Sequence, residues 1–205
     1  MIKIENIIGP SPEQWQAVIR GMRNPKNSWE LSDSQIEEDG FYIGEKDLAL
    51  MMNLAKAGSD HRKYLRMLPV WMDITAPIYW IAEHDTYKVA TVRNSCSFMH
   101  KGCAKPFEIS DFSIPGPTAR KKIEEDIKVL NKLREDYLAT KEESIFQEIR
   151  SILPSGYNQR YTWESNYEVL LNIYFSRRHH RLPEWRTFCE TIENEVPHFK
   201  EILLC

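Results

Sequence analysis

The stretch from Gln147 to Trp185 holds the side chains whose types and spacing are best suited to chemistry. Its second half predicts one amphipathic helix, because large apolar residues recur at helical spacing. Asn166 and Arg177 lie eleven positions apart, about three helical turns, so we expect them on nearly the same line of that helix. Asn172 falls on a different line, between two apolar residues, where a buried amide needs hydrogen-bond partners. The expected packed face consists of Trp163, Tyr167, Leu170, Leu171 and Tyr174.

A cluster of donor side chains ends this predicted helix before Leu182 and Pro183, where the proline prevents its continuation. Basic residues at a helix C-terminus complement the helix dipole, so ordinary helix-end charge explains the cluster as well as a binding site does. Both interpretations stay open on the pattern alone. The cluster consists of Arg177, Arg178, His179, His180 and Arg181.

The same stretch resembles the C-terminal half of the flavin-dependent thymidylate synthases, a family that methylates deoxyuridylate with a flavin, methylenetetrahydrofolate and NADPH. That family has an arginine four residues before a proline, as Arg150 stands before Pro154 here. A tryptophan, two asparagines and an arginine then follow at the family's intervals without a gap, and the resemblance extends over residues 59–185. The matching positions are Trp163, Asn166, Asn172 and Arg177.

The resemblance implies a role for each matched residue. Arg177 would polarise the uracil ring as the catalytic group, and Arg150 would bind the nucleotide phosphate. In the family a histidine near the flavin lies sixteen residues before the proline of an Ala-Pro-Ile turn, and His61 precedes Pro77 by the same interval. The implied substrate-binding residues are Glu83, Asn94, Cys96, Ser97, Arg150 and Arg177. The implied flavin-binding residues are His61, Lys63, Tyr87, Lys88, Asn166, Asn172 and His180.

The family's central signature, which contains an Arg-His-Arg sequence, is altered in this chain. Residues 86–88 are Thr-Tyr-Lys at those positions, and only Lys88 and Thr91 keep the expected chemistry. Phe98 replaces an arginine that faces the phosphate, which removes a charge-assisted hydrogen bond. The cations that would have to compensate are Arg93, Lys101 and Lys105.

Other departures leave alternatives open. Arg66 and Gln147 stand where the family usually has glutamates, and Glu148 points about a hundred degrees away from Gln147, so it is no automatic substitute. Cys96 replaces a serine: its thiol could attack C6 of a pyrimidine if nearby cations lowered its pKa, or it could be a small residue in a tight loop. Between Arg177 and Trp185 this chain has one residue more than some members of the family, so the position that meets the flavin is not fixed and three side chains could do so. These are His179, His180 and Arg181.

The resemblance implies reductive methylation of deoxyuridylate at C5 by an FAD-dependent methyltransferase, with NADPH and methylenetetrahydrofolate as co-substrates. The altered signature keeps two alternatives open: a related enzyme acting on another pyrimidine nucleotide, and a non-catalytic protein that binds a flavin or a nucleotide. We favour the enzyme, because polar groups on a packed helix are costly to bury without purpose. The resemblance also implies a homotetramer with sites between subunits, in which Arg150 and Arg177 act with Lys88 and Cys96 from a neighbouring subunit.

The composition fits one globular domain over residues 1–205, because 42% hydrophobic and 28% charged residues are enough for a sizeable core. The net charge of −3 gives no reason to expect nonspecific nucleic-acid binding. No apolar run has membrane-spanning length and no leader pattern stands at the N-terminus, which favours a cytoplasmic protein without membrane contact. The cysteines lack Cys-x-x-Cys spacing, so neither a metal site nor a disulfide framework is expected. They are Cys96, Cys103, Cys189 and Cys205.

Helix-rich structure follows from the periodicity, and the resemblance implies an α+β fold with a small mixed or antiparallel sheet. Ser11 opens a capping box with Gln14, and Gly58 is typical of a helix end. Strands are expected at 1–8, at 68–75 and within 86–98, and irregular connections at 24–45 and 102–117. Further helices are expected at 12–23, 46–57, 77–84, 118–140, 142–153 and 184–195, with a short one starting at 59. The expected buried stripe of the longest helix is Ile123, Ile127, Leu130, Leu133, Tyr137 and Leu138.

Overall fold

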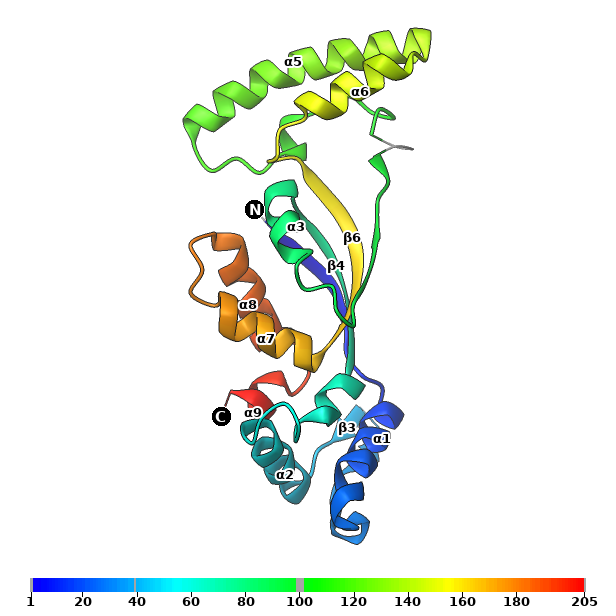
Figure 1. Ribbon diagram of the computed structural model, residues 1–205, viewed down its shortest axis with the longest axis vertical. Helices are drawn as coiled ribbons and strands as arrows, with labels where there is room; N and C mark the ends of the chain where they lie inside the picture. Colours follow the sequence, from blue (N-terminus) through cyan, green and yellow to red (C-terminus); the bar gives the residue numbers. More distant parts are fainter. Residues whose placement is uncertain (1, 39, 99–101, 205) are drawn as a thin grey trace. The chain divides into compact units, whose positions relative to one another are not determined.

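Helices, a four-stranded sheet and a two-stranded hairpin make up the structure, a computed structural model that describes residues 2–38, 40–98 and 102–204 (Figure 1). The strands are β1 (Lys3–Ile8), β2 (Gln35–Glu37), β3 (Gly40–Tyr42), β4 (Pro69–Pro77), β5 (Val92–Ser95) and β6 (Asn158–Asn166). The helices are α1 (Pro12–Arg23), α2 (Glu45–Lys56), α3 (Ile78–His84), α5 (Pro117–Thr140), α6 (Glu143–Ile152), α7 (Tyr167–Arg177), α8 (Pro183–Glu195) and α9 (Phe199–Leu203). The sheet has the order β1-β4-β6-β5, and β2 pairs with β3 separately, so the expected α+β fold class is confirmed.

Two compact units divide the chain between them. The first comprises Met1–Lys3, Ile74–Thr86 and Asn94–Thr162, and it contains α3, α5 and α6. The second comprises Ile4–Asp73, Tyr87–Arg93 and Trp163–Cys205, and it contains α1, α2, α7, α8 and α9. The division falls inside the strands of the four-stranded sheet, so each of these strands contributes residues to both units.

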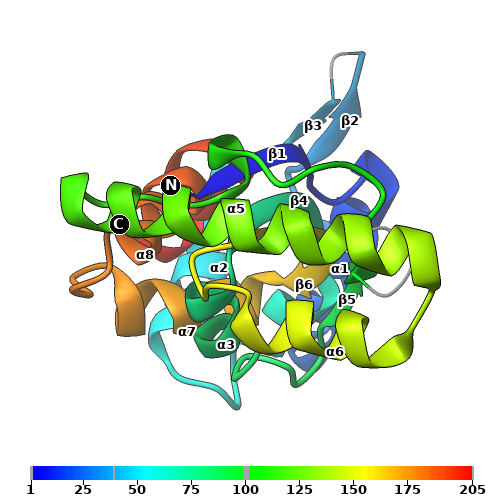
Figure 2. The same cartoon turned by 90° about the horizontal axis from the view of Figure 1, so that it is seen from above.

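A helical hairpin organises the first unit, in which α5 and α6 lie side by side (Figures 1 and 2). Leu138 was expected in the buried stripe of α5 but is 39% exposed. It lies about 100° around the helix from the line through Ile123, Leu130 and Tyr137, which explains its exposure. The buried core of this unit consists of Cys103, Phe107, Phe112, Ile123, Leu130, Phe146 and Ile149.

In the second unit, α1 begins at the capping box that the sequence predicts. The Gln14 backbone N–H donates to Ser11 Oγ at 3.3 Å, and the Ser11 N–H donates to Gln14 Oε1 at 2.8 Å. The ring of Trp15 on the buried face of α1 stacks on Phe41 with 6.2 Å between ring centroids. Gly58, with φ of +105°, follows the end of α2 in a left-handed conformation, as expected.

The residues before Tyr167 form strand β6, so the expected helix start near Trp163 is wrong. Tyr161, Trp163 and Ser165 are buried and Thr162 is exposed, which is the alternation of a strand. Trp163 and Tyr167 are four positions apart, a spacing that a helix also produces, so the apolar pattern alone did not separate the two structures.

Two asparagines differ from their expected environments as a consequence. Asn166 is the N-cap of α7, with an extended backbone (φ −142°, ψ 167°), and its side chain accepts the Val169 N–H at 3.1 Å. It therefore does not lie on a helical line with Arg177. Asn172 is exposed, on the same side of α7 as the exposed Phe175. The buried side chains of α7 are Tyr167, Glu168, Leu170, Leu171, Ile173 and Tyr174.

The polar stretch 24–45 contains more regular structure than its composition predicts. The 3₁₀ helices Asn24–Lys26 and Trp29–Leu31 precede the β2–β3 hairpin, in which Ile36 pairs with Phe41 (Figure 2). Strands of three residues carry too little alternation to be recognised in a sequence. The short helix expected from residue 59 is a turn followed by a 3₁₀ helix at Lys63–Met67.

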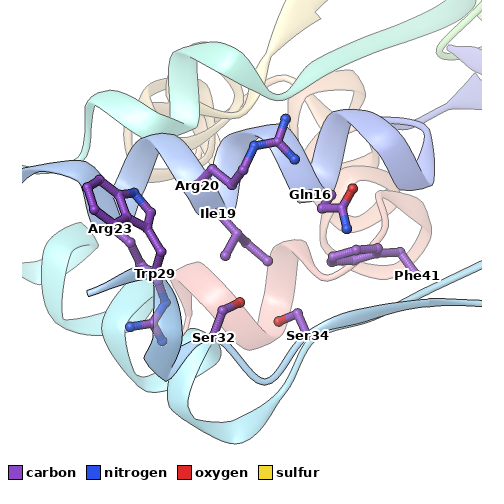
Figure 3. Close-up of a pocket in the computed structure, with 8 residues that line it drawn as sticks. All are labelled: Gln16, Ile19, Arg20, Arg23, Trp29, Ser32, Ser34 and Phe41. Carbon is purple, nitrogen blue, oxygen red and sulfur yellow. The ribbon is translucent and has the colours of Figure 1, made fainter. Parts of the chain in front are cut away.

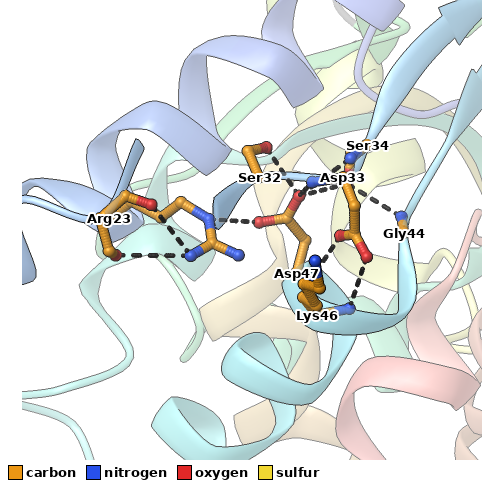
Figure 4. Close-up of polar contacts among 8 residues, drawn as sticks. Arg23, Ser32, Asp33, Ser34, Gly44, Lys46 and Asp47 are labelled. Atoms are coloured by element: carbon orange, nitrogen blue, oxygen red, sulfur yellow. Dashed lines mark hydrogen bonds and ion pairs between the residues drawn. The ribbon is translucent and has the colours of Figure 1, made fainter. Parts of the chain in front are cut away.

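Asp47, in the first turn of α2, is the centre of a buried polar network (Figure 4). Its Oδ1 accepts the Nε–H of Arg23 at 2.6 Å, and its Oδ2 accepts the hydroxyls of Ser32 and Ser34 at 2.8 and 2.7 Å. The backbone N–H groups of Asp33 and Ser34 also donate to Oδ2, each at 3.1 Å. Burial alone would raise the pKa of the Asp47 carboxyl, but the hydrogen bonds from Ser34, Ser32 and Arg23 outweigh burial and lower it below its ordinary value.

Replacing Asp47 with asparagine is expected to lower the free energy of unfolding by about 3 kcal/mol, because Arg23 keeps a buried charge and loses its partner. The carboxylate contributes this stability above its unfolded-state pKa, about 3.9, and loses it as the pH falls through its lower folded-state pKa. Urea unfolding followed from neutral to strongly acidic pH should therefore show the difference between the two proteins shrinking in acid.

The matched control is Asp126→Asn, which removes a carboxylate whose ion pair with Lys122 lies at the surface of α5. That substitution should change stability by less than about 1 kcal/mol. Equal losses of unfolding free energy in the two variants would contradict the role assigned to Asp47. So would a difference in unfolding free energy between the parent protein and the Asp47 variant that does not vary with pH.

Candidate functional site

Two aromatic rings hold the guanidinium of Arg177, the last residue of α7. The Nε–H of Arg177 donates to Tyr87 Oη at 2.9 Å. The guanidinium carbon lies 4.8 Å from the ring centroid of Trp185 and 5.6 Å from that of Tyr87. Trp185 is completely buried, whereas Arg177 is half-buried. Cation–π attraction and the hydrogen bond therefore orient a cation that still reaches the surface.

The segment that carries Tyr87 runs along α7. The Thr91 hydroxyl donates to the Tyr87 carbonyl at 3.0 Å, and Ala90 adopts a left-handed φ of +59°. The Asn166 side-chain amide donates to the Ala90 carbonyl at 3.4 Å while it caps α7. Because Tyr87 meets Arg177 at the other end of the helix, the segment is held at both ends of α7.

His180 extends the cluster around Arg177. Its backbone N–H donates to the Arg177 carbonyl at 2.9 Å, and its ring lies edge-on to Trp185 with 6.3 Å between centroids. Of the three groups that the sequence left open, His180 is half-buried against this cluster, whereas His179 and Arg181 are exposed.

An ion pair anchors the segment of His61 and Lys63 at the start of α7. Arg62 lies between them, and its Nε and Nη2 donate to the two carboxylate oxygens of Glu168 at 2.9 and 3.0 Å. Such a bidentate pair fixes both distance and orientation. His61 and Lys63 are exposed, so they project from a segment that is held at the same end of α7 as Asn166.

The expected flavin-binding residues therefore gather around α7, with one exception. Tyr87 and His180 lie at its last turn, and Lys88 is an exposed cation next to Tyr87. Asn172 is the exception, because it lies on the solvent-facing side of α7 and in none of the contacts described above.

In the first unit, expected substrate-binding residues line two neighbouring cavities. Cys96 and Ser97 line one of about 200 Å³, together with residues 157–160. Arg150 lines the other, of about 360 Å³, on α5 and α6. Phe98 lines the first cavity and contacts Phe146 of the second, with 6.0 Å between ring centroids. Cys96, Ser97 and Arg150 therefore belong to adjoining surfaces.

Backbone contacts fix Cys96 beside β6. Its N–H donates to the Arg160 carbonyl at 2.9 Å, and its carbonyl accepts the Gln159 side-chain amide at 2.9 Å. The thiol is exposed and forms no disulfide within the described residues. An accessible thiol in a held loop suits both interpretations of Cys96.

The other two expected substrate-binding residues of this unit lie elsewhere. Glu83 is half-buried on α3, and Asn94 is exposed on β5. Neither belongs to the lining of the two cavities.

Phe98 is half-buried and packs against an aromatic core. Its ring centroid lies 6.0 Å from Phe146, 5.8 Å from Tyr157 and 6.4 Å from Phe107. A Cβ added at Gly102 would come within 2.7 Å of the Phe98 ring, so the chain also packs closely over it. A guanidinium here would place a charge in apolar surroundings, which is strongly unfavourable.

The cations expected to compensate for Phe98 do not line its cavity in the part of the chain that the structure describes. Lys105 donates to Asp111 Oδ1 at 2.7 Å, and Arg93 belongs to the second unit. Lys101, like Cys205, lies outside the described residues. Among the described residues, Arg160 of β6 is the cation that lines the Cys96 cavity, and no sequence pattern indicated it.

Sequence reasoning also missed three residues that build the surroundings of α7. Trp185 lies in the helix expected at 184–195, and its spacing did not indicate a contact with Arg177. Arg62 and Glu168 are 106 positions apart, so no local pattern could pair them. The available signal for Arg62 was its place between His61 and Lys63.

Across the described residues, no group of three or more His, Cys, Asp or Glu side chains is arranged to hold a metal ion. Among the helices described, none is both long and apolar enough to cross a membrane.

Comparison with known proteins gives matches in structure only. No family model matches the sequence, and no curated protein matches it. Thymidylate synthase X from Helicobacter pylori, with FAD and dUMP, is similar with a TM-score of 0.71 at 15% identity, over 98% of this chain and 95% of that chain. A second structure of the flavin-dependent thymidylate synthase from Helicobacter pylori, complexed with FAD and dUMP, gives 0.71 at 16% identity, over 98% and 96%.

A further similar structure is the UMP/dUMP methylase PolB from Streptomyces cacaoi, bound with 5-Br dUMP. Its TM-score is 0.68 at 15% identity, over 98% of this chain and 94% of that chain. The agreement spans nearly the whole of both chains, so it concerns the fold rather than a shared fragment. The chain has the fold of the flavin-dependent thymidylate synthases.

Proposed function

We propose that this chain is a flavin-dependent enzyme of the thymidylate synthase type, which methylates deoxyuridylate or a related pyrimidine nucleotide at C5. The observation that carries the proposal is the orientation of Arg177 by Tyr87 and Trp185. The shared fold supports it, because similar structures contain FAD and dUMP.

The chemistry assigned to Arg177 follows from its surroundings. C5 of uracil becomes a better nucleophile when negative charge on the ring nitrogen and oxygen is stabilised, and a guanidinium offers a planar fork of donors for that purpose. Tyr87 and Trp185 restrict the guanidinium before any substrate arrives. Orientation in advance is what makes such a group effective, since it does not have to reorganise during the reaction.

Residues around α7 fit a flavin dinucleotide in chemical type. Lys63 and Lys88 are exposed cations suited to a diphosphate, and His61, Tyr87 and His180 add imidazole and phenol groups. When bound, the flavin would carry the one-carbon unit of methylenetetrahydrofolate and the reducing equivalents of NADPH. The proposal includes a cytoplasmic homotetramer in which residues of neighbouring subunits complete each site.

A second candidate function is methylation of another pyrimidine nucleotide, and Phe98 favours it. Phe98 stands where the family has a phosphate-facing arginine, and its ring packs in the aromatic core instead. Among the described residues, Arg150 and Arg160 are then the cations that line the two cavities. A change in phosphate recognition is compatible with a different nucleotide. The similarity to the UMP/dUMP methylase PolB supports this candidate as well.

The visible absorption spectrum of the purified protein with added FAD tests the flavin part of the proposal. We expect a bound flavin band that shifts when deoxyuridylate is added, because the nucleotide would change the surroundings of the flavin ring. A protein that binds no flavin, with or without nucleotide, would contradict the proposed function and leave only the fold.

Replacing Arg177 with alanine is expected to lower kcat for nucleotide methylation by about 100-fold or more, because an oriented charge-stabilising donor is lost. Folding should survive, since the lost cation–π contact contributes only about 1 kcal/mol. Conversion of deoxyuridylate to thymidylate by chromatography, together with thermal unfolding, measures both effects.

Arg178→Ala is the matched control for that variant. Arg178 carries the same charge one position later, and its guanidinium lies over Tyr174 and Phe175 instead. Its removal should leave kcat nearly unchanged. Ordinary activity in the Arg177 variant, or equal losses in both variants, would rule out the mechanism.

Replacing Arg150 with alanine is expected to weaken binding of deoxyuridylate by about 10- to 100-fold, the equivalent of one charge-assisted hydrogen bond. Binding of deoxyuridine, which lacks the phosphate, should not change. Calorimetric titration of both ligands tests the assignment, and a loss that is equal for the two ligands would show that Arg150 does not meet the phosphate.

A further inference from the structure

A cavity of about 320 Å³ in the second unit contains none of the residues assigned to the flavin or the nucleotide (Figure 3). Its lining comes from one face of α1, from residues between Trp29 and Ser34, and from Phe41. We propose that this cavity binds a planar aromatic molecule of one ring or two fused rings that carries an anionic group, a carboxylate or a phosphate. Its lining consists of Gln16, Ile19, Arg20, Arg23, Trp29, Ser32, Ser34 and Phe41.

The lining carries positive charge. Arg20 and Arg23 are the charged residues that line it, and no acidic side chain among the described residues does so. The buried Arg23 is neutralised by Asp47 at 2.6 Å. The exposed guanidinium of Arg20 has no hydrogen-bond or ion-pair partner in the described part of the chain. Arg20 is therefore available to a carboxylate or phosphate, which a guanidinium binds through two parallel hydrogen bonds.

Aromatic rings supply the rest of the recognition surface. Trp29 is 50% exposed, yet its ring is fixed in place because its Nε1–H donates to Asn24 Oδ1 at 2.8 Å. Phe41 is held by stacking on Trp15 with an interplanar angle of 8°. Figure 3 shows Trp29 and Phe41 on either side of the buried Ile19. Fixed rings beside an apolar floor favour a flat ligand, which would cover the exposed indole.

The polar groups of the cavity wall are ordered without a ligand. Asp47 accepts hydrogen bonds from Ser32, Ser34 and Arg23, so these three side chains have defined positions (Figure 4). A preorganised wall reduces the entropy lost on binding. The volume lies at the lower limit of small-molecule sites, about 300 Å³, which favours a ligand of one or two rings over a dinucleotide.

Fluorine NMR of the full-length protein labelled with 5-fluorotryptophan tests the inference, and the Trp29→Phe variant identifies the Trp29 signal by its loss. The probes are indole-3-acetate and adenosine 5′-monophosphate, with indole-3-acetamide and adenosine as uncharged counterparts. We expect both anions to shift the Trp29 signal and to bind at least about tenfold more tightly than their counterparts. A shift of the Trp29 signal with either anion, together with tighter binding than its own uncharged counterpart, would support the inference.

Two variants separate the role of Arg20 from general charge. Arg20→Gln should weaken binding of the anionic probes by about tenfold and leave binding of the uncharged probes unchanged. Arg120→Gln removes an exposed arginine on α5 and should change neither. No shift of Trp29 with any probe at millimolar concentration, or equal binding by Arg20→Gln and the parent protein, would overturn the inference. A shift confined to the Trp185 signal would locate binding at the Arg177 cluster. That result would overturn the inference that this cavity binds the ligand, and it would not contradict the proposed function.

Discussion

Burial of α7 is the constraint on which the candidate site depends. Its buried side chains cover most of the helix circumference, so the helix cannot rotate without exposing large rings. Three segments take their positions from it. Arg62 pairs with Glu168 at the first turn, and the Asn166 amide donates to the Ala90 carbonyl just before Thr91. The loop that contains His180 follows Arg177 at the other end. One well-packed helix thus sets the geometry of groups that come from distant parts of the sequence.

Three arginines of the second unit show how environment decides what one side-chain type does. Arg23 is buried and fully engaged with Asp47, so its contribution is to stability. Arg177 is half-buried and oriented by two aromatic rings and the Tyr87 hydroxyl, which suits the catalytic role proposed for it. Arg20 is exposed beside a fixed indole and suits recognition of an anion. The three guanidinium groups carry the same charge, and they differ in their burial and in the groups that each contacts in the folded protein.

Phe98 packs in an aromatic cluster at a position where the resemblance implies a phosphate-facing arginine. Its ring joins Phe107, Phe146 and Tyr157, and Gly102 permits the close approach of the chain. Burying an aromatic ring contributes roughly 2 kcal/mol, comparable to a charge-assisted hydrogen bond with a ligand. The phosphate contact that the resemblance implies for this position would therefore be exchanged for apolar packing of similar stabilising free energy.

The sequence by itself determined the features that depend on neighbours a few positions away. The capping box at Ser11 and the left-handed Gly58 were recognisable because local hydrogen bonds and steric limits act within a turn, whereas the intervals around Arg177 were recognised only by resemblance to a family. Only the tertiary structure decided that Trp163 lies on a strand and that Asn172 faces solvent, because burial is set by segments far along the chain. The same holds for Tyr87, which meets Arg177 across 90 positions through a contact that no periodicity encodes.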